Sequence, residues 1–170
     1  MDWKLSGRVL VLIDAANLSH AAEDLGFKIR YRQLARFFRT ETDLVRVVYY
    51  SSEFETEAHA AFILALRKYG YQIESKPVKV ISRGRGAVLR KANFDVEITL
   101  DAMDWLGEYD TLALFSGDSD FHALVRRLQA KGKKIVVCSM RDHIARELIA
   151  SADHYIDVSK LSHDVVQRKR

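Results

Sequence analysis

Four aspartates have the chemistry and the spacing to share a metal ion: Asp14, Asp95, Asp118 and Asp120. Three of them follow the ends of apolar runs, and the fourth opens a segment of helical periodicity. Carboxylates that lie close together repel one another and raise the pKa of at least one member unless a cation compensates. Hard oxygen ligands prefer Mg²⁺ or Mn²⁺ to softer metals. If the fold gathers these side chains, they could hold a divalent ion that activates water for attack on a phosphodiester.

Each aspartate taken alone also has a structural explanation. Asp14 could close a turn, and Asp95 or Asp120 could cap a helix by accepting backbone N–H bonds. Capping is the better explanation for any one position taken alone. A common site is favoured only by the two motifs that contain Asp14, Asp118 and Asp120, which are described below.

The segments that must position these aspartates alternate between strands and helices. Apolar or β-branched runs predict strands at 9–13, 44–50, 71–74, 111–115, 134–139 and 154–158, and periodic apolar residues predict helices at 31–40, 56–69, 94–105, 121–131 and 145–150. This order indicates an α/β domain with a mostly parallel sheet of about five or six strands and helices on both faces. Ligands of such sheets bind at the carboxyl ends of the strands, where the aspartates are expected to converge.

Length and composition indicate one domain without an extracellular or membrane character. The chain has 170 residues, of which 48% are hydrophobic, enough for one core. We expect a domain over 1–160 and a basic C-terminal tail over 161–170. Cys138 is the only cysteine, so no disulfide forms within the chain. No apolar run approaches the roughly 20 residues of a membrane span, and we expect a cytoplasmic protein without membrane contact.

A basic segment leads directly to Asp95. It contains six cations and no acid: Lys76, Lys79, Arg83, Arg85, Arg90 and Lys91. A solvated loop explains such a run as well as nucleic-acid contact does. Beside a metal site, however, these cations could hold phosphates without reading sequence. Tyr49, Tyr50 and Phe54 could stack a base of a single strand, although Tyr49 suits the core equally well.

Two motifs at strand ends carry a resemblance to a known family. They are Asp14-Ala15-Ala16-Asn17 and Ser116-Gly117-Asp118-Ser119-Asp120-Phe121, with residues 94–103 between them. The chain resembles NYN domains of the LabA-like branch, within the PIN-like nucleases. The resemblance implies a PIN-like Rossmannoid fold and a metal-dependent ribonuclease in which Asp14, Asp95, Asp118 and Asp120 bind Mg²⁺ or Mn²⁺ and carry catalysis. It also implies that Asn17 and Ser116 support the acids.

Further polar residues receive supporting roles. Asp101 matches another acid of the family, but six residues along a helix turn it about 120° away from Asp95. Ser119 is expected to bind carboxylate or phosphate as a loop hydroxyl. The histidines show no ligand spacing for zinc, although His122 and His143 could approach substrate.

Three functions remain to be compared. The leading hypothesis is an endoribonuclease that acts on single-stranded or structured RNA. The alternative is an RNA-binding or protein-binding regulatory module with little turnover. Nucleotide binding is disfavoured because no Gly-x-Gly-x-x-Gly follows the first strand. The helix over 56–69 and the strand after it offer apolar surface for a homodimer.

Overall fold

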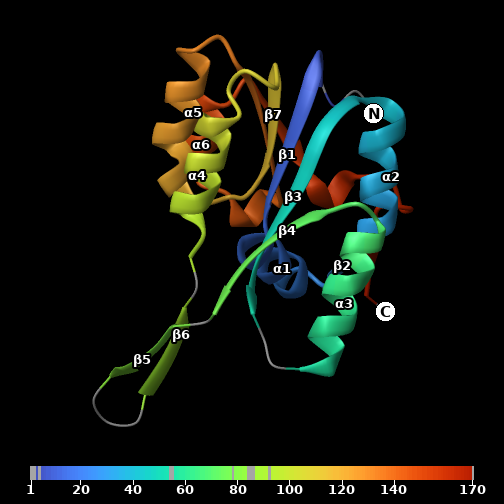
Figure 1. The fold of residues 1–170 in the computed structure, drawn as a ribbon, viewed down its shortest axis with the longest axis vertical. Coiled ribbons are helices and arrows are strands. Elements are labelled where there is room, and N and C mark those ends of the chain that lie inside the picture. The colour runs from blue at the N-terminus through green and yellow to red at the C-terminus, as the bar shows by residue number, and fades with distance from the viewer. Residues whose placement is uncertain are drawn as a thin grey trace.

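A parallel six-stranded sheet forms the centre of the molecule in the computed structural model (Figure 1). The structure describes residues 3, 5–53, 56–77, 79–83, 87–91 and 93–169, and only the backbone within 79–91. In spatial order the strands are β4 (Gln72–Pro77), β3 (Asp43–Glu53), β1 (Arg8–Asp14), β7 (Thr111–Phe115), β8 (Lys134–Ser139) and β9 (His154–Asp157). Strand order reverses beside β1, so the carboxyl ends of β1 and β7 frame the position where such sheets bind ligands.

Helices cover both faces of this sheet, as the sequence predicts. One face carries α1 (Ala15–Asp24), α2 (Tyr31–Glu41) and α3 (Glu57–Lys68), and the other carries α4 (Asp95–Asp104), α5 (His122–Gln129) and α6 (Arg146–Ser151). Side chains of β1 alternate between the two cores: Val9, Val11 and Ile13 join the first, and Leu10 and Leu12 join the second. Burial on both faces explains the uninterrupted apolar run of this strand.

Local signals set the ends of these helices. Thr56 caps α3 by accepting from the His59 N–H at 3.2 Å, and the helix ends in Arg67 and Lys68 ahead of Gly70. Gly70 has φ of 86°, a left-handed conformation that glycine adopts without strain. The six predicted strands form the main sheet, and the predicted helices pack on its faces. The observed ends of these elements differ from the predicted ends by a few residues. Helix α1 was absent from the prediction because it follows the first strand without a turn signal.

Two antiparallel pairs lie outside the main sheet. Strand β10 (Val166–Arg168) pairs with β2 (Phe27–Ile29), and Val165 and Val166 are buried. The segment expected to be a basic tail is thus attached to the domain, because its apolar residues pack against the first core. Strands β5 (Lys79–Arg83) and β6 (Ala87–Lys91) form the hairpin between β4 and α4.

The structure leaves most of the predicted basic segment undescribed. Arg85 lies outside the described residues, as do the side chains of Lys79, Arg83, Arg90 and Lys91. Lys76 is described. Cys138 is buried in the first core, as its apolar run predicts. Within the described part of the chain, no helix has the length and apolar character needed to cross a bilayer.

Candidate metal centre

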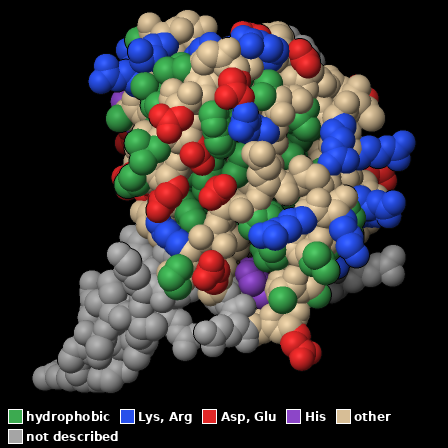
Figure 2. Space-filling model, in the orientation of Figure 1, with side chains coloured by type: hydrophobic (Ala, Val, Ile, Leu, Met, Phe, Trp, Pro, Cys, Tyr) green, Lys and Arg blue, Asp and Glu red, His purple; other side chains and the backbone are tan. Residues whose placement is uncertain are grey.

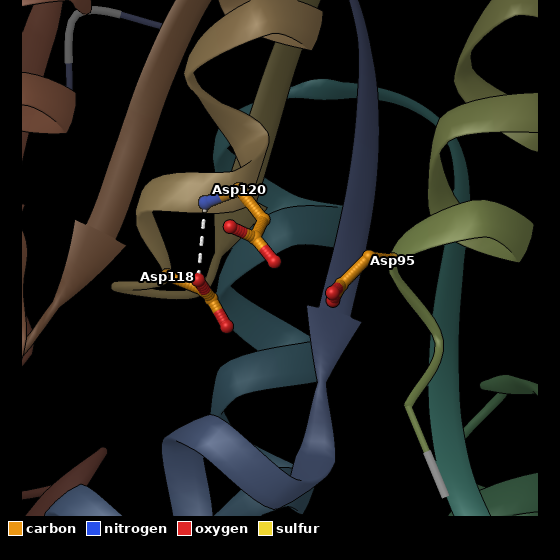
Figure 3. A group of neighbouring side chains, drawn as sticks. All are labelled: Asp95, Asp118 and Asp120. Carbon is orange, nitrogen blue, oxygen red and sulfur yellow. Dashed lines mark hydrogen bonds between the residues drawn. The ribbon is translucent and has the colours of Figure 1, made fainter.

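Three carboxylates converge at the carboxyl edge of the sheet (Figure 3). Asp95, Asp118 and Asp120 each offer an oxygen, and these oxygens lie within 4.8 Å of one another. Asp95 comes from the start of α4, and the other two come from the turn after β7. The Asp95 side chain thus points into the same space as those of Asp118 and Asp120, although it is more than twenty positions away from them in the chain.

The start of α4 positions Asp95. It is the first residue of the helix, and its backbone N–H donates to Asn93 Oδ1 at 2.9 Å. The helix N-terminus carries a partial positive charge that favours a carboxylate there. Phe94 is the N-cap residue of α4 and makes no side-chain cap bond, so Asp95 does not have the capping role that the sequence offered. Figure 3 shows the Asp95 side chain directed towards the other acids.

A short turn fixes Asp118 and Asp120 relative to each other. Asp118 precedes the 3₁₀ helix η1 (Ser119–Phe121), and its Oδ1 accepts from the Asp120 N–H at 3.0 Å. The Asp118 N–H in turn donates to Ser116 Oγ at 3.3 Å. Asp118 therefore caps the turn with one oxygen, and Figure 3 shows its other oxygen directed towards the cluster.

Asp14 lies beside the three acids, and two hydrogen bonds hold its carboxylate. It ends β1, caps α1 by accepting from the Asn17 N–H at 3.2 Å, and accepts from Ser116 Oγ at 3.2 Å. Burial raises its pKa, the two hydrogen bonds oppose this, and the charges of Asp95 and Asp118 raise it further. The structure thus brings Asp14 within electrostatic reach of Asp95 and Asp118, although its carboxylate is not part of the group whose oxygens lie within 4.8 Å of one another.

Asn17 holds the loop that carries Asp118. Its Oδ1 accepts from the Gly117 N–H at 2.8 Å, and the Gly117 carbonyl accepts from the Ala145 N–H at 3.0 Å. A Cβ atom at Gly117 would lie 1.8 Å from the His143 carbonyl oxygen, so only glycine fits. Gly117 stands inside one of the two motifs, but no local pattern marks the requirement for glycine there, because the clashing atom belongs to His143.

Asp101 is not part of the three-carboxylate group and is engaged by Tyr50 instead. Its Oδ2 accepts from the Tyr50 hydroxyl at 2.6 Å, which ties α4 to β3. Tyr50 is fully buried and Tyr49 is 3% exposed. Neither ring can therefore stack on a base, and the predicted stacking is wrong for both. Phe54 lies outside the described residues, and Ser119 is exposed beside the acids.

Lys76 is engaged inside the protein. Its ammonium group contacts the Asn93 carbonyl and the Glu97 carboxylate, and it lies 4.5 Å from the centre of the Phe94 ring. These partners stand on both sides of Asp95 in the chain. In this structure Lys76 braces the start of α4, a contact that the sequence did not reveal.

The two histidines considered near the site differ in their surroundings. His143 Nε2 lies 2.9 Å from Asp24 Oδ2, which links the loop behind Gly117 to α1. His122 is exposed directly after η1. His143 is therefore held by α1, whereas His122 stands at the surface two residues from Asp120.

The donor set fits a divalent cation. Among the described residues, Asp118 and Asp120 form no ion pair with a lysine, arginine or histidine. Closely spaced carboxylates without a cation are unfavourable, and their oxygens are the ligands that Mg²⁺ and Mn²⁺ prefer. The arrangement can hold a hard metal ion at an open edge of the sheet.

Comparisons with known proteins agree with this architecture. The model of the NYN domain family matches residues 8–161. The low amplitude and bright protein LabA of Synechococcus elongatus is 32% identical over 168 residues, which is 96% of this chain and 90% of that protein. A crystal structure of a Vibrio parahaemolyticus protein of unknown function superposes with a TM-score of 0.79 at 27% identity, covering 94% of this chain and 96% of the other.

Proposed function

This chain belongs to the NYN domain family, and from its acid cluster we propose that it is a metal-dependent ribonuclease, an endoribonuclease that hydrolyses RNA phosphodiester bonds. NYN domains are PIN-like nuclease domains, and this membership makes a nuclease the first function to test. The observation that carries the proposal is the convergence of Asp95, Asp118 and Asp120 within 4.8 Å.

The four acids would have different roles at the site. Asp95, Asp118 and Asp120 would bind one or two ions, and a Mg²⁺ or Mn²⁺ ion held there would supply Lewis-acid activation of water and of the phosphodiester. Asp14, whose pKa is raised, holds a proton more readily than an ordinary carboxyl group and releases it when a cation approaches. Asn17 and Ser116 hold the loop and the carboxylates in register.

The decisive experiment is a cleavage assay with Asp118→Asn. Labelled single-stranded RNA and matching DNA are incubated with the protein in Mn²⁺, in Mg²⁺ and in EDTA. Asparagine keeps the oxygen that caps η1, so the fold survives while a charged ligand is lost. We expect metal-dependent cleavage of RNA that falls by more than about a hundredfold in the variant.

Asp164→Asn is the matched control, because Asp164 is exposed and lies outside the cluster. It should cleave as the parent does. Full activity of Asp118→Asn, or equal activity in EDTA, would sink the assignment.

The second candidate is an RNA-binding or protein-binding module with little turnover. The name of the LabA relative states no enzymatic activity, which is the observation that keeps this candidate open. The same assay separates the two: RNA that is bound but remains intact in every metal favours the module.

A further inference from the structure

A basic groove lies between α2 and the end of α3, on the face of the sheet away from α4 (Figure 1). It has a volume of about 690 Å³ and is lined by Arg32, Gln33, Arg36, Arg39, Thr40, Lys68 and Tyr69. We call it the α2–α3 groove. In Figure 2, Lys and Arg side chains gather on the right of the molecule, where Figure 1 shows these helices. Four of the seven lining residues are cations and none is an acid, so the groove suits an anion.

The arginines of α2 form a single row. At about 100° per residue, Arg32, Arg36 and Arg39 lie within roughly 60° of one another around the helix. The buried Leu34 and Phe38 lie on the opposite side. From Arg32 to Arg39 the row is about 10 Å long, at about 1.5 Å per residue. A row of this length suits an extended polyanion better than one isolated phosphate.

Three of the four cations have no acidic partner among the residues that the structure describes. In the part of the chain that the structure describes, Arg32, Arg36 and Lys68 form no ion pair. Arg39 differs, because its guanidinium donates to the Tyr69 carbonyl and so fixes the wall of the groove. Three exposed charges therefore remain for a ligand, whereas Lys76 is already paired with Glu97.

The candidate metal centre cannot attract a polyanion by itself. Its carboxylates carry negative charge that one or two divalent ions only balance, so affinity for a nucleic acid must come from cations elsewhere. We propose that the α2–α3 groove binds the phosphate backbone of RNA. This inference takes its ligand from the proposed function, and it assigns the binding to a surface remote from the basic segment that the sequence predicted.

Helix α3 gives the length of RNA that is needed. It begins after β3, at the carboxyl edge of the sheet, and ends at Lys68 in the groove. Its 12 residues span about 18 Å, which is the least distance that an RNA strand in contact with both places must cover. An RNA strand that contacts both the acids and the groove must therefore extend over more than about 18 Å.

The test compares two triple variants of the full chain in an RNA-binding titration. The groove variant combines Arg32→Gln, Arg36→Gln and Lys68→Gln, and it keeps Arg39 because that side chain holds Tyr69. The control variant combines Arg126→Gln, Arg127→Gln and Lys131→Gln, three exposed cations at the α5 end of the other face. Both lose the same charge. Binding of end-labelled single-stranded RNA of roughly 20 nucleotides, well beyond the length of α3, is followed by anisotropy in EDTA at several salt concentrations.

We expect the groove variant to bind RNA about tenfold more weakly than the parent, and the slope of the logarithm of the binding constant against the logarithm of salt concentration to fall by about two units. The control variant should bind RNA within about twofold of the parent. A groove variant that binds the long RNA no more weakly than the control overturns the proposal.

This readout is independent of cleavage. If the groove variant loses RNA binding but the parent never cuts RNA, the groove assignment stands and the ribonuclease falls. If the parent cuts RNA and the groove variant binds as well as the control does, the ribonuclease stands and the groove assignment falls.

Discussion

The acidic edge of the sheet and the basic α2–α3 groove differ in how firmly their charged side chains are held. At the acidic edge, hydrogen bonds from Asn17, Ser116 and Asp120 fix Asp14 and Asp118 in place. In the groove, three of the four cations have no partner among the described residues. A site that binds a small ion needs ligands at fixed positions, whereas a polyanion binds to cations that can adjust. The difference teaches that rigidity, more than charge, separates a candidate reaction centre from a candidate binding surface.

The largest effect is expected where the acidic edge has no room to adjust. Gly117→Ala would place a Cβ 1.8 Å from the backbone oxygen of His143, so the loop that carries Asp118 must move. We expect cleavage to fall by about a hundredfold, since a shift of about 1 Å is enough for that, and stability to fall by about 2 kcal/mol. Cleavage assays and denaturant titrations check this.

Gly107→Ala is the control for that prediction, because nothing lies within 4 Å of the Cβ position at Gly107. It should leave activity and stability close to those of the parent. An active Gly117→Ala protein would show that the acidic edge is less rigid than its hydrogen bonds indicate.

The next effect concerns a cation that belongs to the acidic edge. Lys76→Met removes the contacts that brace both sides of Asp95, and we expect activity to fall by about tenfold, with partial recovery in Lys76→Arg. Because Glu97 already neutralises this ammonium group, the salt dependence of RNA binding should stay unchanged. A slope reduced by about 0.7 would instead assign Lys76 to a phosphate, as the sequence predicted.

A smaller effect is expected from removing one buried charge. Asp14→Asn keeps the cap of α1, since asparagine caps as well as aspartate does, and it removes repulsion from Asp95 and Asp118. In EDTA, we expect the free energy of unfolding of this variant to rise by about 1 kcal/mol. In Mn²⁺ or Mg²⁺, we expect the variant to lose cleavage of RNA.

The pH dependence of that gain has a definite sign. The folded-state pKa of Asp14 lies above its ordinary value, so this carboxyl group contributes stability below the unfolded pKa and loses it as pH rises through the folded pKa. The advantage of Asp14→Asn should therefore be small in acid and grow towards neutral pH. An advantage that shrinks as pH rises, in urea titrations at several pH values, would contradict the raised pKa.

The smallest effect is expected in the groove. The triple variant of Arg32, Arg36 and Lys68 removes no ion pair among the described residues, so the free energy of unfolding should change by less than about 0.5 kcal/mol. Thermal unfolding checks this. Loss of several kcal/mol would mean that these cations support the fold, and the contrast with the acidic edge would disappear.

Much of the architecture could be predicted because each element carries its own local signal. The uninterrupted apolar residues of β1 and β7 indicate strands buried on both faces, and the periodic residues of α3 with Gly70 indicate a helix and its end. Helix α1 and the β2–β10 pair were missed. Strand β2 has three residues and depends on a partner about 140 positions away, so no local pattern marks it.

The positions of the acids, after two strands and at the start of one helix, follow from the sequence alone, because neighbours in the chain set the boundaries of these elements. Tertiary structure decided which acids meet. Ser116 donates a hydrogen bond to Asp14, 102 positions away, because β1 and β7 are adjacent in the sheet. The residues of a single strand do not specify which strands become its neighbours. The same holds for Lys76, which is bound to Glu97, and for the groove that joins α2 to α3. Side chains from distant segments acquire their partners only when the packing of both cores fixes the elements in space.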